Sequence, residues 1–102
     1  MIRIFFTISY NMAKIVDNNK GFKVICMNND EATNLGFGIV PGACICMRCN
    51  DIIQDEIYYI AVLNDVMCKA CYKKWYENAT RYKEDTEYEN RYFNYYSKLL
   101  GL

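Results

Sequence analysis

Two pairs of cysteines, each separated by two residues, place the strongest constraint on how this chain folds. Cys46 and Cys49 form the first pair, and Cys68 and Cys71 form the second after a gap of eighteen residues. A two-residue gap lets both sulfurs of a pair reach one metal ion, and the gap between the pairs is long enough for a hairpin that returns the second pair to the first. The spacing therefore predicts a structural Zn²⁺ site, because four thiolate ligands leave no open position for water or substrate.

The same four cysteines have two alternative interpretations, as redox-active thiol pairs and as an iron site. A redox pair of the thioredoxin type is expected within a β-α-β unit, which this sequence lacks. Iron accepts the same tetrahedral set of sulfur ligands, so an iron-bearing or redox protein stays open as a less favoured alternative.

Two further cysteines stand outside the metal-binding pattern. Cys26 lies in an apolar run and is expected to be a buried thiol of a strand. Cys44 precedes Cys46 by two positions, a gap that fits a shared metal less well than the gap between Cys46 and Cys49. We therefore expect Cys44 to be a bystander.

The length and composition of the chain agree with one small domain in a reducing compartment. The chain has 102 residues, of which 53% are hydrophobic, which is too apolar for a disordered protein. Its first residues have too short an apolar run, and no small-residue cleavage site, for a signal peptide. No stretch has the length of a membrane span. We expect a cytoplasmic protein that does not engage a membrane.

The chain divides into a weakly patterned start and one patterned domain. Residues 1–21 are expected to be weakly structured, and Met12 is a candidate for the true start of translation, with an ordinary strand at Ile2–Ile8 as the alternative. Residues 22–102 are expected to form a single zinc-stabilised α+β domain, with a finger at 44–82 and a C-terminal helix at 86–100.

The apolar pattern predicts short strands before and between the cysteine pairs. Phe22–Met27 is rich in β-branched and apolar residues, and so is Ile57–Leu63, which is apolar on both faces. A turn at Asn64 and Asp65 and a return strand at Val66 and Met67 follow the second run. Asn28–Asp30 offers a cap for a short helical turn at 31–35, which Gly36 ends.

Two helices are predicted after Cys68. The first carries an apolar stripe that runs from Tyr72 to Tyr82. The second begins at a capping box formed by Thr86 and Glu89 and ends at Gly101. Its apolar stripe is predicted to be Tyr88, Tyr92, Tyr95 and Leu99, widened by Phe93, Tyr96 and Leu100.

A cysteine pair in a loop, then a hairpin, then a cysteine pair that leads into a helix is similar to the treble-clef zinc finger. LIM modules and GATA-type fingers share this arrangement, and the spacing resembles the GATA-type pattern in particular, over about residues 44–82. Tyr58–Leu63 followed by Cys68–Trp75 also resembles small uncharacterised four-cysteine proteins of bacteria and their mobile elements. The expected fold is thus small α+β: a treble-clef-like zinc-bound hairpin followed by two C-terminal helices, with a short N-terminal strand region.

The charges depart from the GATA-type pattern. Such fingers bind DNA through basic residues, whereas the segment between the two cysteine pairs is acidic and holds no lysine or arginine. The whole chain has 12 basic and 12 acidic residues. A basic stripe on the first helix remains, and a solvated helix face is its favoured interpretation. Weak nucleic-acid binding through this stripe is the alternative function; its residues are Lys69, Lys73, Lys74 and Arg81.

No catalytic constellation is present in the sequence, which contains no histidine, so we do not expect an enzyme. The aromatic residues of the last helix are the better indication of function, because tyrosine is enriched where proteins dock. Core packing is the other interpretation of the same residues. We expect a small zinc-stabilised protein-interaction or accessory module of a bacterium or phage, with a protein partner. The candidate partner-binding residues are Tyr88, Tyr92, Phe93 and Tyr96.

Overall fold

The computed structural model describes residues 12–40 and 43–102. The two alternatives for the N-terminus, a start at Met12 and a strand at Ile2–Ile8, concern residues 1–11, which lie outside these ranges. Within them, no helix combines the length and the apolar character that a membrane crossing requires.

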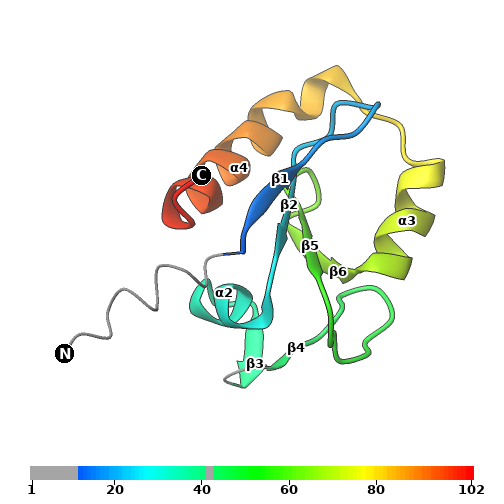
Figure 1. Ribbon diagram of the computed structural model, residues 1–102. Helices are drawn as coiled ribbons and strands as arrows, with labels where there is room; N and C mark the ends of the chain where they lie inside the picture. The colour runs from blue at the N-terminus through cyan, green and yellow to red at the C-terminus, as the bar shows by residue number, and fades with distance from the viewer. Residues whose placement is uncertain (1–11, 41–42) are drawn as a thin grey trace.

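The centre of the fold is an antiparallel sheet of four strands in the order β1-β2-β5-β6 (Figure 1). A second sheet pairs β3 with β4. The strands are β1 Lys14–Val16, β2 Val24–Met27, β3 Gly38–Val40, β4 Ala43–Cys44, β5 Ile57–Ile60 and β6 Asp65–Cys68. The helices are α2 Asn29–Asn34, α3 Lys69–Asn78 and α4 Thr86–Leu99, and the short 3₁₀ turn η1, Lys83–Asp85, precedes α4. The molecule is small α+β, as predicted.

The two inner strands are covered on both faces, as the apolar run at Ile57–Leu63 predicted. Successive side chains of a strand point to opposite faces. Tyr58 stacks on Tyr72 of α3, with ring centroids 4.8 Å apart. Tyr59 contacts Tyr96 of α4, with centroids 4.9 Å apart. The helices α3 and α4 therefore pack on opposite sides of the sheet (Figure 1).

Strand β1 lies inside the segment that was expected to be weakly structured. It pairs with β2 in the register Ile15↔Ile25. Its residues are mostly exposed, so the sequence pattern of this edge strand is weak. The expectation of weak structure is therefore wrong for residues 14–16.

The turn between β5 and β6 comes earlier than predicted. Strand β5 ends at Ile60, and the turn occupies residues 61–64. Asn64 adopts a left-handed φ of 53°, and its side-chain oxygen accepts a hydrogen bond of 2.7 Å from the Tyr59 hydroxyl. Ala61 looks like a strand residue in the sequence because it is apolar, but it is buried from within the turn.

The short helix α2 has a cap within the predicted segment, at Asn28, but it begins two residues earlier than predicted and spans Asn29–Asn34. The Asn28 side chain accepts from the Glu31 amide at 2.8 Å, and the Glu31 carboxylate accepts from the Asn28 amide at 2.9 Å. Gly36, at φ 93°, ends the helix in a Schellman motif, in which the Phe37 amide donates to the Ala32 carbonyl. Strand β3 follows this turn.

Helix α3 ends four residues before its predicted end. It spans Lys69–Asn78, and Ala79 is already extended, with ψ 139°. The Lys20 ammonium group donates to the carbonyls of Tyr76 and Ala79, so a distant lysine satisfies the end of the helix. Tyr82 consequently leaves the predicted stripe and is 55% exposed.

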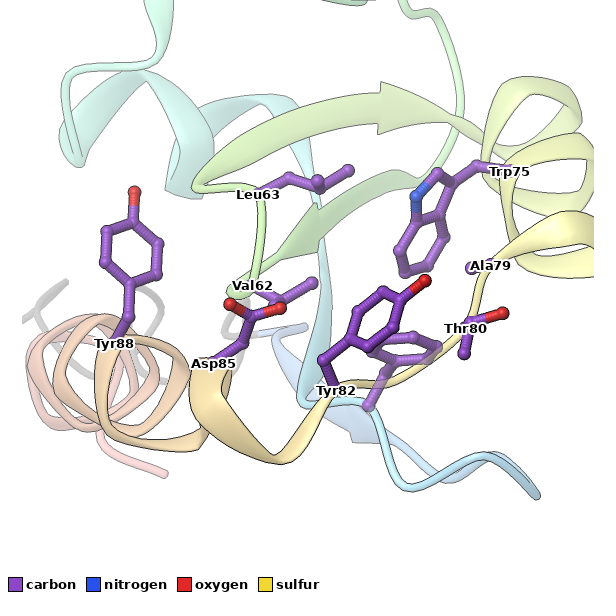
Figure 2. A pocket seen from close by; sticks show the side chains of 9 residues that line it. Val62, Leu63, Trp75, Ala79, Thr80, Tyr82, Asp85 and Tyr88 are labelled. Carbon is purple, nitrogen blue, oxygen red and sulfur yellow. The ribbon is translucent and has the colours of Figure 1, made fainter.

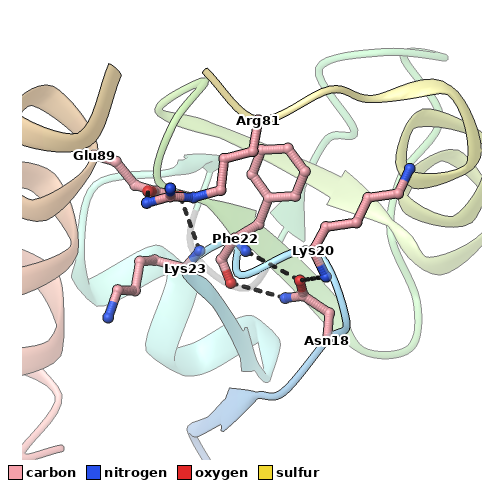
Figure 3. Close-up of polar contacts among 6 residues, drawn as sticks. All are labelled: Asn18, Lys20, Phe22, Lys23, Arg81 and Glu89. Atoms are coloured by element: carbon pink, nitrogen blue, oxygen red, sulfur yellow. Dashed lines mark hydrogen bonds and ion pairs between the residues drawn. The ribbon is translucent and has the colours of Figure 1, made fainter. Parts of the chain in front are cut away.

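The capping box predicted at the start of α4 is wrong. Thr86 is already helical, with φ −58° and ψ −43°, because η1 runs directly into α4. Glu89 turns inward instead: its carboxylate accepts from the Lys23 amide at 2.9 Å and pairs with Arg81 at 2.7 Å (Figure 3). The true N-cap residue, Asp85, makes no side-chain capping bond.

The buried face of α4 is displaced by one residue from the predicted stripe. Tyr88, Tyr95 and Leu99 are 43%, 59% and 57% exposed. The face that meets the core holds Glu89, Phe93, Tyr96, Ser97 and Leu100, with Tyr92 at its margin. The helix ends at Gly101 as predicted, at φ 77°.

Candidate metal centre

The four cysteines come from two separate segments that the fold brings together. Cys46 and Cys49 lie in the loop after β4, whereas Cys68 ends β6 and Cys71 lies in the first turn of α3. All four Sγ atoms lie within 4.8 Å of one another. A tetrahedral site with Zn–S distances of about 2.3 Å places its sulfurs about 3.8 Å apart. The cluster therefore has dimensions that suit a metal ion.

The loop of the first pair is held in a tight turn. The Asn50 amide donates to the Cys46 carbonyl, and the Cys46 amide donates to the Asp51 carbonyl, both at 2.9 Å. Asn50 reverses the chain with a left-handed φ of 67°, which asparagine tolerates better than most residues. This turn points both sulfurs of the pair to the same side.

Backbone contacts fix this loop against β6. The Met47 amide donates to the Val66 carbonyl at 3.0 Å, and the Met47 sulfur accepts from the Val66 amide at 3.4 Å. Val66 lies two residues before Cys68, so these contacts hold the two cysteine pairs in one position relative to each other.

Amide groups of the loop favour a thiolate at Cys46. The amides of Arg48 and Cys49 donate to its Sγ at 3.4 and 3.5 Å. Burial opposes ionisation of Cys46, but these amides and that of Cys68 bring its pKa down to about 6. At Cys71, burial and then the hydrogen bonds to the neighbouring sulfurs raise the pKa to about 12. A divalent cation would favour the thiolate at each ligand.

Cys26 lies in a strand, as the sequence predicted, and Cys44 lies in β4 just before the metal-binding loop. Cys26 is a buried residue of β2, and burial raises the pKa of its thiol. Cys44 is fully buried, and its thiol donates to the Phe37 carbonyl at 3.7 Å. It is not part of the four-sulfur group found among the described residues. All six cysteines are free thiols, with no disulfide.

The other predicted site residues do not all reach the surface. Lys69, Lys73 and Lys74 are exposed on α3, whereas Arg81 lies beyond the helix and pairs with Glu89. Of the aromatic candidates on α4, Tyr88 is exposed, and Tyr92, Phe93 and Tyr96 pack against the core. Sequence reasoning missed that the outward apolar residues of this helix include Tyr95 and Leu99, because a stripe of tyrosines looks like a core face.

No protein-family model, curated protein or solved structure matches this chain significantly. The four-cysteine cluster is consistent with a zinc-finger-like site.

Proposed function

We propose that this chain is a small zinc-stabilised accessory module that binds a protein partner, and that its zinc is purely structural. The observation that carries the metal part of the proposal is the convergence of four sulfurs from two segments within 4.8 Å. The loop, the β5–β6 hairpin and helix α3 follow one another around the cysteines in the order of a treble-clef finger. Four thiolates fill the coordination sphere of zinc, so the proposal includes no catalysis at the metal.

A structural role suits the place of the site in the fold. The metal would tie the loop after β4 to the junction of β6 and α3, where the described contacts are a few hydrogen bonds around Met47 and Cys46. Metal binding at such a site adds to the free energy of folding, because the unfolded chain has no preformed site.

The metal proposal is tested by comparing Cys46→Ser with Cys44→Ser. Both cysteines are fully buried, so the two substitutions disturb the core to a similar degree, but one removes a sulfur of the cluster. Elemental analysis should find one zinc per chain in the parent protein and in Cys44→Ser, and clearly less in Cys46→Ser. Equal zinc content in both variants would overturn the ligand assignment. Iron instead of zinc would give a coloured protein.

The outward face of α4 supports the partner-binding part of the proposal. Tyr88, Tyr95 and Leu99 are exposed along it, and Leu102, which follows the helix, is 44% exposed. A patch of large apolar side chains on a small protein is a common feature of protein–protein interfaces. Tyrosines contribute strongly to such interfaces because they lose little conformational entropy on binding.

The partner proposal is tested by affinity purification from the native host followed by cross-linking. The double variant Tyr88→Ala/Tyr95→Ala should lose a partner that the parent protein retains, whereas Lys73→Ala/Lys74→Ala should retain it. The reverse pattern, with binding that collapses as salt rises, would favour the nucleic-acid alternative instead.

A further inference from the structure

A pocket of about 560 Å³ lies between the turn after β5, the end of α3 and the start of α4 (Figure 2). Its volume falls in the range of small-molecule sites. The residues that matter for its chemistry are Phe22, Leu63, Trp75, Tyr82, Asp85 and Tyr88. Four of the nine lining residues are aromatic, and Asp85 is the one charged residue in the described lining.

Aromatic side chains line one side of the pocket. The rings of Phe22 and Trp75 lie 4.8 Å apart between centroids and are tilted by 56°, so their faces are not parallel. Figure 2 shows Trp75 and Tyr82 on the same side of the pocket. The face of an aromatic ring carries negative electrostatic potential and attracts cations.

Asp85 adds a full negative charge beside these rings. Figure 2 places its side chain between Tyr82 and Tyr88. Although Asp85 is the N-cap residue of α4, its side chain makes no capping hydrogen bond. Across residues 12–40 and 43–102, it takes part in no ion pair. Its carboxylate is therefore available to a ligand.

Two of the cations on the segments that flank the pocket, Arg81 and Lys20, are engaged elsewhere. Arg81 pairs with Glu89, and Lys20 donates to the carbonyls at the end of α3 and lies over the ring of Tyr76. Neither of them belongs to the described lining of the pocket, and the same holds for Lys23 and Lys83, which neighbour lining residues in the chain. The charge of Asp85 is thus not neutralised by a cation of the pocket itself.

We propose that this pocket binds an alkylated ammonium group, with Trp75 and Tyr82 facing its methyl groups and Asp85 compensating its charge. Such a cation is large and weakly hydrated, so aromatic faces replace its water shell at low cost. This ligand site goes beyond the accessory function proposed above and does not depend on it.

The test uses the full chain with its metal and choline chloride as the probe. Trp75 is the only tryptophan of the sequence, so fluorescence excited at a wavelength that tyrosine does not absorb reports on this pocket. Choline should change the Trp75 emission saturably at constant ionic strength. The uncharged carbon isostere of choline, dimethylbutanol, should bind at least about tenfold more weakly, because it has the same shape without the charge.

Two variants separate the aromatic contribution from the charge. Asp85→Asn should weaken choline binding at least about tenfold and leave dimethylbutanol binding unchanged. Tyr82→Leu should weaken choline binding, whereas Tyr95→Leu should not; these tyrosines are similarly exposed, at 55% and 59%, but only Tyr82 lines the pocket.

Three results would overturn the proposal. The first is the absence of a saturable response to choline. The second is equal affinity for choline and its isostere, which would mean a merely apolar pocket. The third is undiminished choline binding in both Asp85→Asn and Tyr82→Leu, with circular dichroism showing that the variants are folded.

Discussion

At the scale of single residues, Glu89 joins helix α4 to the segment just before it and to a residue that lies 66 positions away in the chain. It is 1% exposed, and its carboxylate accepts from the Lys23 amide beside β2 and from the Arg81 side chain before α4 (Figure 3). A buried carboxylate is tolerated only where such partners replace its water. Glu89 therefore fixes the position of α4 against the sheet.

Replacing Glu89 with alanine should lower the free energy of unfolding by about 2–4 kcal/mol. The Lys23 amide and the Arg81 guanidinium would lose their acceptor, and a buried donor without a partner is costly. This loss of stability is smaller than that expected for a fully buried ion pair, because the Arg81 side chain is 28% exposed. Urea unfolding monitored by circular dichroism measures the change.

Glu87→Ala, at an exposed position of the same helical turn, is the control. An equal loss of stability in both variants would refute the role of Glu89 in fixing α4 against the sheet.

Buried tyrosines make stability depend on pH in the alkaline range. Burial raises the pKa of Tyr59 well above its ordinary value, and burial also raises the pKa of Tyr58. The folded state therefore prefers the neutral phenols. Their contribution to stability is complete below pH of about 10, where unfolded tyrosine stays neutral, and is lost as the pH rises above that value.

The free energy of unfolding should therefore fall as the pH is raised above about 10. The fall should be shallower in Tyr59→Phe, which has no hydroxyl to ionise, although this variant also loses the bond to Asn64. Tyr95→Phe, at an exposed position, is the control and should keep the slope of the parent protein. If Tyr59→Phe retains the parent slope, the buried hydroxyl is not the cause.

At the scale of elements, the ends of the helices depend on residues outside them. Helix α3 carries no basic residue in its last turn, and Lys20 supplies the missing charge from the segment between β1 and β2. A cation at a helix C-terminus interacts favourably with the exposed carbonyls and with the helix dipole. This contact links the N-terminal edge of the sheet to α3.

Lys20→Met should cost about 1 kcal/mol of stability and loosen the last turn of α3. Methionine keeps most of the side-chain length but cannot donate to the carbonyls of Tyr76 and Ala79. Hydrogen exchange of the α3 amides measures the loosening. Lys73→Met, which changes an exposed lysine within the same helix, should leave that exchange unchanged; similar exchange in both variants would contradict the capping role.

The apolar periodicity of α4 predicts the wrong buried face of this helix. Tyr88, Tyr92, Tyr95 and Leu99 have the same helical spacing as the true core face, which begins one residue later at Glu89. Apolar periodicity favours the tyrosine stripe because glutamate counts as polar. Only the tertiary contacts with Lys23 and Arg81 make a buried glutamate favourable, and these are not visible in the sequence.

At the scale of the whole molecule, local signals predicted the strands β2, β5 and β6 and the cysteine cluster, but not the strands β1, β3 and β4 or the sheet order. The two-residue gaps between cysteines are typical of metal ligands, so the sequence alone predicted which four cysteines cluster. The pairing of β2 with β5 joins residues separated by α2, the small sheet and the first cysteine loop. Pairing between strands that are distant in the sequence produces no periodic pattern of apolar residues. Strand β1 is mostly exposed, so its own apolar pattern is also weak.

Removal of the metal should destabilise one part of the molecule most. We expect a strong chelator to lower the melting temperature and to remove hydrogen-exchange protection first from β6 and the start of α3, which carry Cys68 and Cys71. The contacts between β1 and β2 do not involve the cluster and should be lost later. Uniform loss of protection, or none, would contradict this localised role.

X-ray absorption at the zinc edge of the full chain tests the central claim most directly. A single zinc bound by Cys46, Cys49, Cys68 and Cys71 should give a first shell of four sulfurs at about 2.3 Å. A first shell that contains nitrogen or oxygen ligands, or fewer than four sulfurs, would contradict it.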